Sequence, residues 1–172
     1  MSLILDGSNG VTFPVGGNPQ AAPAGVIQVV QATTNSGTTI SVNTYTSISG
    51  LTASITPKFS TSKILVSFSC PFYVQGSANG GGFAIYKNGS LLLNPNTSDG
   101  TGPFTFYQGS GGSVGALVSY QYLDSPATTS STTYAIYARP YFASTGNMYI
   151  NQGTGTPTNY GTATITLMEI AQ

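Results

Sequence analysis

Short runs of β-branched and aromatic residues recur about every ten residues from Val26 to the C-terminus, and each run is bounded by turn-forming residues. This spacing is typical of an all-β sandwich or barrel. The runs predict strands over residues 26–33, 39–48, 63–73, 82–87, 90–93, 104–108, 114–123, 132–142, 147–151 and 162–170. Because no stretch sustains the 3.6-residue apolar spacing of an amphipathic helix, we expect little helix.

Two of these runs alternate strongly enough to predict which side chains face the core. One inward set is Ile64, Val66, Phe68 and Cys70, and the other is Tyr134, Ile136, Ala138 and Phe142. Successive side chains of a strand point to opposite faces of the sheet. Tyr137 and Tyr141 are therefore expected on the outer face, where exposed aromatic rings indicate a surface for a partner.

The strongest local signal is Asn88-Gly89, which lies between the apolar runs 83–86 and 91–93. A type I′ turn needs a positive φ at both of its central residues, and Asn-Gly supplies this more readily than other pairs. The sequence therefore predicts a β-hairpin centred on these two residues.

Residues 1–25 differ from the rest of the chain in composition. They hold a short apolar run, a turn at residues 6–10, a second short run and a stretch rich in Gly, Pro and Ala. This segment has too little apolar surface for a core, and its Pro and Gly residues oppose a helix. We predict an extended arm over residues 1–25 and a β-sandwich domain over residues 26–172. The residues expected to dock the arm on a virion are Leu3, Ile4, Leu5, Val11, Phe13 and Pro14.

Charged side chains are very scarce in this chain. Its 172 residues include four Lys plus Arg, four Asp plus Glu and no histidine. Acid–base catalysis, metal binding and phosphate binding all require ionisable groups brought close together, so we expect no enzyme activity, no metal and no cofactor. Nucleic-acid binding depends on clustered cations and is not expected either. A net charge of zero removes a source of repulsion between copies, which favours self-association.

Several eye-catching residues have simple structural interpretations. Asp99 lacks a nearby second carboxylate and is interpreted as an Asx-turn residue, not as half of a calcium site. Asp124 precedes Ser125-Pro126 and is likewise interpreted as a turn residue. Cys70, the one cysteine, is expected to be a small buried hydrophobe. The glycine-rich segment 109–115 lacks the Lys-Ser/Thr of a phosphate-binding loop and is expected to be a flexible loop.

The chain shows no secretory signal at its start and no apolar stretch of about 20 residues that would span a bilayer. We therefore expect synthesis in the cytoplasm and no membrane partner. An extracellular location would require a route other than the general secretory pathway.

Tyrosine is the chain's main resource for recognition, with eleven Tyr against eight Phe and no Trp. Tyr provides a large contact area at low entropic cost and is common at interfaces. Most of these rings are expected to pack in the core or between subunits. The candidates for a partner or receptor surface are Tyr107, Tyr137, Tyr141 and Tyr160.

Several segments resemble virion proteins of tailed bacteriophages. Residues 3–14, Leu-Ile-Leu-Asp-Gly-Ser-Asn-Gly-Val-Thr-Phe-Pro, resemble a segment that often precedes a terminal β domain in tail-fibre proteins. Segments resembling that domain are residues 62–66, 86–89, 122–129 and 165–170. The resemblance implies a homotrimeric jelly roll of the tumour-necrosis-factor-like kind, made in the host cytoplasm, displayed on the virion surface and released by lysis.

The length of the arm separates two functions within this resemblance. At about 3.3 Å per residue, 25 residues reach no more than about 80 Å, which leaves no room for a fibre shaft. We therefore favour a trimeric capsid decoration knob, a cement or head-fibre protein that contacts the major capsid protein. The alternative is a short tail-fibre or baseplate tip that binds a host-surface glycan. A glycan hydrolase is disfavoured, because Asp99, Asp124 and Glu169 would have to converge to supply its paired carboxylates.

Overall fold

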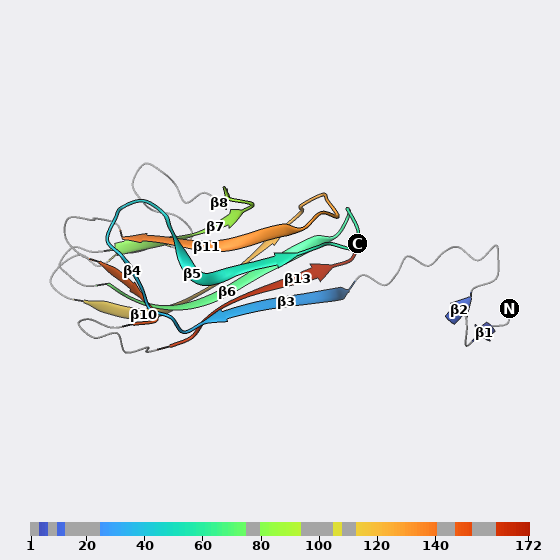
Figure 1. Cartoon of the computed structure of the whole chain (residues 1–172), viewed down its shortest axis with the longest axis horizontal. Helices are drawn as coiled ribbons and strands as arrows, with labels where there is room; N and C mark the ends of the chain where they lie inside the picture. Colours follow the sequence, from blue (N-terminus) through green and yellow to red (C-terminus); the bar gives the residue numbers. More distant parts are fainter. Residues whose placement is uncertain are drawn as a thin grey trace.

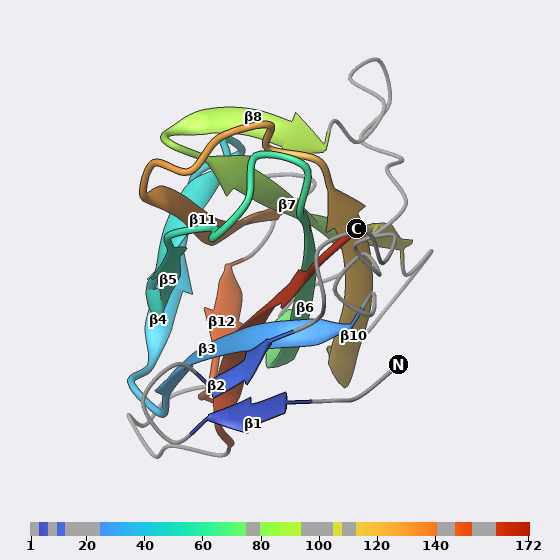
Figure 2. The ribbon, with the colours of Figure 1, turned by 90° about the vertical axis from the view of Figure 1, so that its right-hand side faces the viewer.

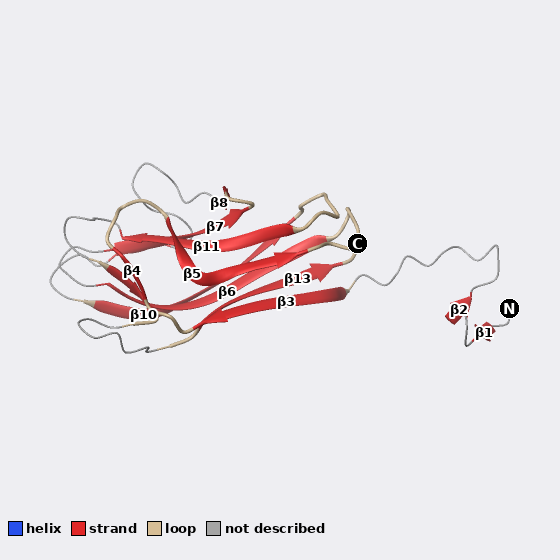
Figure 3. Cartoon of the chain, viewed as in Figure 1, coloured by secondary structure: helices blue, strands red, loops and turns tan. Residues whose placement is uncertain are grey.

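The computed structural model describes residues 4–6, 10–12, 25–74, 80–93, 105–107, 113–140, 147–152 and 161–172. For residues 4–6, 10–12 and 105–107 it describes the backbone alone. The described residues form strands and connecting loops, and none of them lies in a helix (Figure 3). The predicted all-β class is confirmed.

The first of two sheets is built around β6 (Lys63–Val74), the longest strand. One edge of β6 pairs from Ile64 to Val74 with the whole of β10 (Val114–Asp124). The other edge pairs first with β13 (Ala163–Ile170) and then, near the end of β6, with β12 (Met148–Ile150). β3 (Val26–Thr34) lies outside β13, and β4 (Thr38–Ile40) lies outside β12. All these pairings are antiparallel.

The second sheet has the order β5-β11-β7-β8. Its strands are β5 (Thr46–Ile55), β11 (Thr132–Pro140), β7 (Gly80–Lys87) and β8 (Ser90–Leu93). β9 (Thr105–Tyr107) also pairs with β7, at the opposite end of that strand from the β7–β8 turn. The chain passes between the two sheets after β4, β5, β6, β9, β10 and β11, as in a jelly roll, and the sheets form the two layers seen in Figures 1 and 2.

The core lies between the two sheets, and the predicted alternation is confirmed where it is described. Even-numbered residues of β6 from Ile64 to Val74 are buried, while the intervening residues are half-buried. In β11, Tyr134, Ile136 and Ala138 are buried as predicted. Phe142, predicted to join them, lies outside the described residues. Burying these rows supplies the main driving force for the sandwich.

One strand prediction is wrong: residues 39–48 do not form a single strand. β4 ends at Ile40 in the first sheet, residues 41–45 cross over, and β5 runs from Thr46 to Ile55 in the second sheet. Within β5 the period-two pattern is broken, because Ile48 and Leu51 are both buried although three positions separate them. A register shift against β11 and a positive φ of 79° at Gly50 mark a β-bulge there.

The predicted hairpin is confirmed. Asn88 and Gly89 join β7 to β8, and their φ angles of 49° and 78° are both positive, as a type I′ turn requires. Asn88 also joins the hairpin to β11, because its backbone N–H donates to the Thr133 carbonyl and its Oδ1 accepts from the Thr133 N–H, each at 2.9 Å.

Two short strands belong to the N-terminal arm, β1 (Ile4–Asp6) and β2 (Gly10–Thr12). They pair with each other in a separate two-stranded sheet, with Leu5 opposite Val11. Within the described part of the chain, neither strand has a ladder with the sandwich. The two short runs predicted on either side of a turn are thus paired with each other, and an arm over residues 1–25 stays a prediction.

Candidate interaction surfaces

The outer side of the first sheet is broad and almost without charge. We call it the first-sheet face and define it by the outward residues of four strands: Val29, Gln31 and Thr33 of β3; Thr164, Thr166, Met168 and Ile170 of β13; Lys63, Leu65, Ser67, Ser69, Pro71 and Tyr73 of β6; and Gly115, Leu117, Ser119, Gln121 and Leu123 of β10. Lys63, at one end, is the one charged residue among these positions.

Side chains on the first-sheet face form rows that run across the strands. The strand register places Val29, Met168, Leu65 and Leu123 in one continuous apolar row. The next row is polar and neutral and contains Gln31, Thr166, Ser67 and Gln121. The Gln31 amide donates a hydrogen bond to Thr166 Oγ1 at 3.0 Å. The exposed fraction is 57% for Val29 and 46% for Leu123, so water contacts both ends of the apolar row.

Further along the first-sheet face, Leu117 is 64% exposed, the highest value among the large apolar side chains in the described part of the chain. A hollow of about 240 Å³ adjoins it, and its walls include Pro71, Tyr73, Gly115 and Gln152. Exposed apolar side chains that are contiguous, unlike scattered ones, mark a surface for a partner.

The outer side of the second sheet carries a different cluster, the tyrosine–arginine patch, formed by Tyr45, Tyr86, Tyr137 and Arg139. Tyr137 and Arg139 are two positions apart on β11, so both point outward. Across the ladder, Tyr137 faces the small residue Ala84, which leaves room for its ring to reach Tyr86. The rings of Tyr86 and Tyr137 stack with their centroids 3.8 Å apart and their planes at 20°.

Arg139 anchors the other end of the patch. Its guanidinium lies 5.1 Å from the centroid of the Tyr45 ring, in a cation–π arrangement, and donates to the Asn43 carbonyl at 3.3 Å. Burial raises the pKa of Tyr45, although the charge of Arg139 opposes this shift. Burial also raises the pKa of Tyr86, and the neighbouring Tyr137 adds to the increase. Tyr45 and Tyr86 therefore remain neutral hydrogen-bonding groups at physiological pH.

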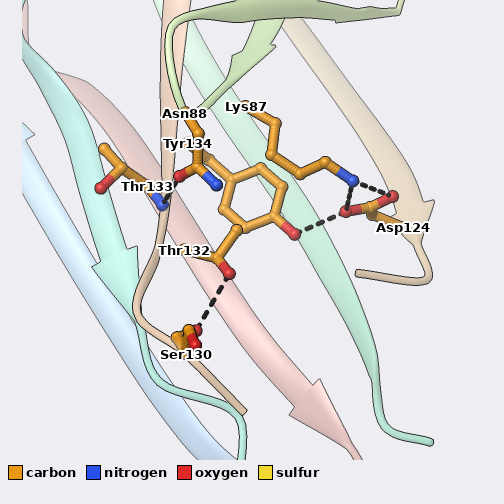
Figure 4. Close-up of polar contacts among 7 residues, drawn as sticks. All are labelled: Lys87, Asn88, Asp124, Ser130, Thr132, Thr133 and Tyr134. Carbon is orange, nitrogen blue, oxygen red and sulfur yellow. Dashed lines mark hydrogen bonds and ion pairs between the residues drawn. The ribbon is translucent and has the colours of Figure 1, made fainter. Parts of the chain in front are cut away.

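The interpretation of Asp124 as a turn residue is wrong, because Asp124 is the last residue of β10 and its side chain is buried. Its carboxylate accepts two contacts from Lys87 Nζ, at 2.9 and 3.2 Å, and one from the Tyr134 hydroxyl at 2.6 Å (Figure 4). Burial and this hydrogen bond raise the pKa of Tyr134. The three residues come from both sheets, so they join the two layers.

Glu169 is also buried and structural. Its Oε1 accepts from the backbone N–H of Lys58 at 2.6 Å and, more weakly, from that of Phe59 at 3.4 Å. With its amide oriented to donate, the Gln28 side chain reaches Glu169 Oε2 at 3.1 Å. Sequence reasoning missed both buried carboxylates, because most of their partners lie far away along the chain: Lys87 is 37 residues from Asp124, and Lys58 is 111 residues from Glu169.

The described residues contain no group of three or more Cys, Asp and Glu side chains that would hold a metal ion. Asp124 and Glu169 belong to the separate contacts above, and Asp99, the third carboxylate considered for paired catalysis, lies outside the described residues. Nor does the described part of the chain contain a helix that would cross a membrane.

The residues predicted for interaction are distributed as follows. Ile4, Leu5 and Val11 lie in the β1–β2 ladder, whereas Leu3, Phe13 and Pro14 lie outside the described residues. Tyr107 lies in β9 opposite Gly80, with only its backbone described. Tyr141 and Tyr160 lie outside the described residues. Tyr137 is on the outer face as predicted, and the structure adds Tyr45, Tyr86 and Arg139 to it. Strand alternation alone also places Arg139 beside Tyr137.

A scan against protein-family models finds no match, and a search of curated proteins finds none either. Solved structures give weak similarities. One is the structure of the infectious bursal disease virus Gx strain, which is 11% identical, with a TM-score of 0.38 over 93% of this chain and 41% of that chain.

Two further solved structures match at the same level. Particles derived from a mutant VP2 protein of infectious bursal disease virus are 13% identical, with a TM-score of 0.38 over 92% of this chain and 40% of that one. The T13 particle of that virus is 11% identical, with a TM-score of 0.38 over 92% and 41%. The chain thus spans about two-fifths of each matched protein, and similarity this low does not transfer a function.

Proposed function

We propose that this protein is a non-enzymatic structural component of a tailed-bacteriophage virion, a homotrimeric knob that decorates the capsid and docks through its N-terminal arm. The observation that carries this proposal is the first-sheet face, a wide exposed surface with a single charge at its end. The segments that resemble tail-fibre and other virion proteins supply the biological setting.

The first-sheet face has the chemistry that a symmetric interface needs. Close to a symmetry axis a residue lies near its own copies, so a charge there would meet the same charge, and a charge farther from the axis would lose its water on association. Here the apolar row from Val29 to Leu123 buries surface on association, and the neighbouring Ser, Thr and Gln side chains both donate and accept hydrogen bonds. Copies can therefore meet over this face without burying an unpaired charge.

The arm supports docking to a larger particle. Its strands β1 and β2 pair with each other and not with the sandwich, and the apolar Leu5 and Val11 are partners in that ladder. A two-stranded hairpin alone is only marginally stable in water, so it gains stability by packing on another surface. We assign that surface to the major capsid protein.

A second candidate function is a short tail-fibre or baseplate tip that binds a host-surface glycan. The tyrosine–arginine patch favours it, because stacked aromatic rings and a guanidinium are suitable for sugar rings and their polar substituents. The two candidates share the trimer and the virion location but differ in the number of copies per particle.

Counting copies in purified virions distinguishes the candidates. Quantitative mass spectrometry of the particles is expected to find the chain at hundreds of copies, comparable with the major capsid protein. A few tens of copies would favour the tail tip. Absence of the chain from intact, purified virions would contradict both candidate functions.

A further inference from the structure

The tyrosine–arginine patch lies on the outer side of the second sheet, away from the first-sheet face. In a sandwich the two outer faces point in opposite directions (Figure 2). Association over the first-sheet face therefore leaves this patch open to a ligand.

Arg139 brings a positive charge to the patch, and no carboxylate among the described side chains pairs with it. The side-chain carboxylates described are those of Asp124 and Glu169, and each is committed to the contacts given above. The one ion pair found among the described residues joins Lys87 to Asp124 and does not involve Arg139. Arg139 is half-buried, which strengthens its attraction for an anion.

The guanidinium is also held in place before any ligand binds. A guanidinium has five N–H donors, and the contact with Asn43 uses one of them. The Tyr45 ring, 5.1 Å from the guanidinium carbon, supports the group from one side. The remaining donors suit two oxygens of a carboxylate or phosphate, which a guanidinium binds in a forked arrangement.

Next to this cation, the Tyr86–Tyr137 stack provides half-exposed aromatic surface with two phenol hydroxyls. Such rings pack against the C–H face of a sugar, while their hydroxyls hydrogen-bond to its oxygens. A polyanion such as nucleic acid would require several cations, whereas this patch has one. A ligand with a single negative group on a compact polar ring fits the arrangement best.

We propose that the tyrosine–arginine patch binds an acidic saccharide, with Arg139 taking the carboxylate or phosphate group and the tyrosine pair contacting the sugar ring. The chemistry is shared by carboxylated sugars and phosphorylated sugars. The proposal concerns the isolated protein and holds for a capsid knob and a tail tip alike, so its failure is distinct from failure of the proposed virion role.

The test is a titration of the full-length, ¹⁵N-labelled chain followed by NMR. Methyl β-D-glucuronide and glucose 6-phosphate are the two acidic probes, and methyl β-D-glucoside is the neutral control with the same ring. The probes are added to about 20 mM, a concentration suited to millimolar affinity. We expect at least one acidic probe to change the chemical shifts of backbone amides near residues 43–47, 84–86 and 135–139. The neutral glucoside should cause much smaller shifts. Added salt should weaken the acidic probe, because a charge pair at the surface is screened.

Variants test which positive charge binds the acidic probe. Arg139→Gln should weaken binding of the acidic probe about tenfold or more, and Arg139→Lys should weaken it less, since it keeps the charge but loses the fork. Lys63→Gln, which removes a cation from the first-sheet face, is the matched control and should bind as the wild type does. Thermal unfolding of each variant checks that the sandwich remains intact.

The proposal is wrong if neither acidic probe shifts the patch, if the glucoside binds as well as the glucuronide, or if a folded Arg139→Gln protein retains its affinity. Binding of the glucuronide alone or of glucose 6-phosphate alone supports the proposal and identifies which anionic group is recognised.

Discussion

At the scale of single residues, Asp124 links the two sheets through polar contacts. Its carboxylate accepts from Lys87 of the second sheet at 2.9 Å and from the buried Tyr134 hydroxyl at 2.6 Å (Figure 4). Charge-assisted hydrogen bonds of this kind are the stronger ones, and removing one partner leaves the others unsatisfied. The Lys87 side chain is 28% exposed, so water compensates part of its charge if the pair is broken.

We predict that Asp124→Asn lowers the free energy of unfolding by about 2 kcal/mol, because it removes the charge while keeping the shape. For a chain of this size, that corresponds to a fall in Tm of roughly 4–8 °C, measured by circular dichroism. Lys63→Met, which removes a cation that has no such partner among the described residues, should change the Tm little. If the Tm of Asp124→Asn falls no more than that of Lys63→Met, the contacts of Asp124 with Lys87 and Tyr134 do not stabilise the sandwich.

Cys70 leads to a prediction about alkaline pH. Its thiol is buried, and this burial raises its pKa from 9.0 to about 12. A pKa that is higher in the folded state means that the protonated form is favoured there. The resulting stability is fully present below pH 9 and is lost as the pH rises toward 12.

We therefore expect the wild type to lose stability relative to Cys70→Val between pH 9 and 10.5, by up to about 1.4 kcal/mol per pH unit. Urea unfolding of both proteins measures the difference, and comparing two otherwise identical chains cancels the contribution of Tyr134. At pH 8 the native thiol should react with Ellman's reagent only on unfolding. A constant difference across this pH range, or rapid labelling of the folded protein, would contradict the prediction.

At this scale the sequence predicted apolar residues well and charged residues poorly. Cys70 and its row were assigned correctly because burial of alternate positions depends on the local pattern alone. Asp124 and Glu169 were not, because the contacts that permit their burial depend on register and on the distance between sheets. The tyrosine–arginine patch could be predicted in part. Strand alternation places Arg139 and Tyr137 together, but only the fold adds Tyr45 and Tyr86.

Among the elements, the β7–β8 hairpin is fixed by the backbone conformation of two residues. Gly89 has a φ of 78°, and a Cβ added there would meet no other atom within 4 Å. Gly89→Ala therefore introduces backbone strain without a steric clash, and we expect it to cost about 1 kcal/mol.

Gly115→Ala is the matched control for the hairpin. Its added Cβ would lie in ordinary contact, 3.4 Å from the Tyr73 ring, and its backbone is outside the left-handed region. Its Tm should change less than that of Gly89→Ala in thermal unfolding. Equal losses in the two variants would mean that the turn conformation does not limit stability.

The elements predicted correctly have regular periods and familiar turns, whereas the β4–β5 region does not. The chain changes sheets at residues 41–45, and a bulge follows at Gly50, so the apolar residues Ile48 and Leu51 lose their period-two spacing. A β-bulge places extra residues in one strand opposite its partner and increases the local twist. Whether one forms depends on how neighbouring strands twist and pair, which the sequence of one strand does not encode.

For the whole molecule, the first-sheet face predicts how copies associate. We expect Leu123→Glu to shift the protein from trimer to monomer, because a charge at the end of the apolar row would lie near its own copies or lose its water on assembly. Multi-angle light scattering measures the mass. Leu123 is 46% exposed, so the fold should survive, as circular dichroism would verify.

Thr52→Glu is the control for this variant. Thr52 is exposed on β5, on the outer side of the second sheet, and the new charge there should leave the trimer intact. Dissociation by Thr52→Glu but not by Leu123→Glu would assign assembly to the other sheet. A monomeric wild type would exclude the proposed trimer directly.

The arm supplies the last prediction, because its ladder is separate from the sandwich. Among the described residues, one backbone hydrogen bond crosses the boundary: the Gly25 carbonyl accepts from the Ala171 N–H at 2.9 Å, beside the first residue of β3. Deleting residues 2–25 places the Met1 carbonyl directly before Val26, where it can accept the same bond. We expect the shortened chain to fold and to form the same trimer. In a sedimentation assay with capsids that lack this protein, the full chain should sediment with the capsids and the shortened chain should not. The buried core of the described residues lies within the sandwich. Loss of folding on this deletion would therefore mean that the arm packs into the domain. Retained capsid binding would assign docking to the sandwich itself.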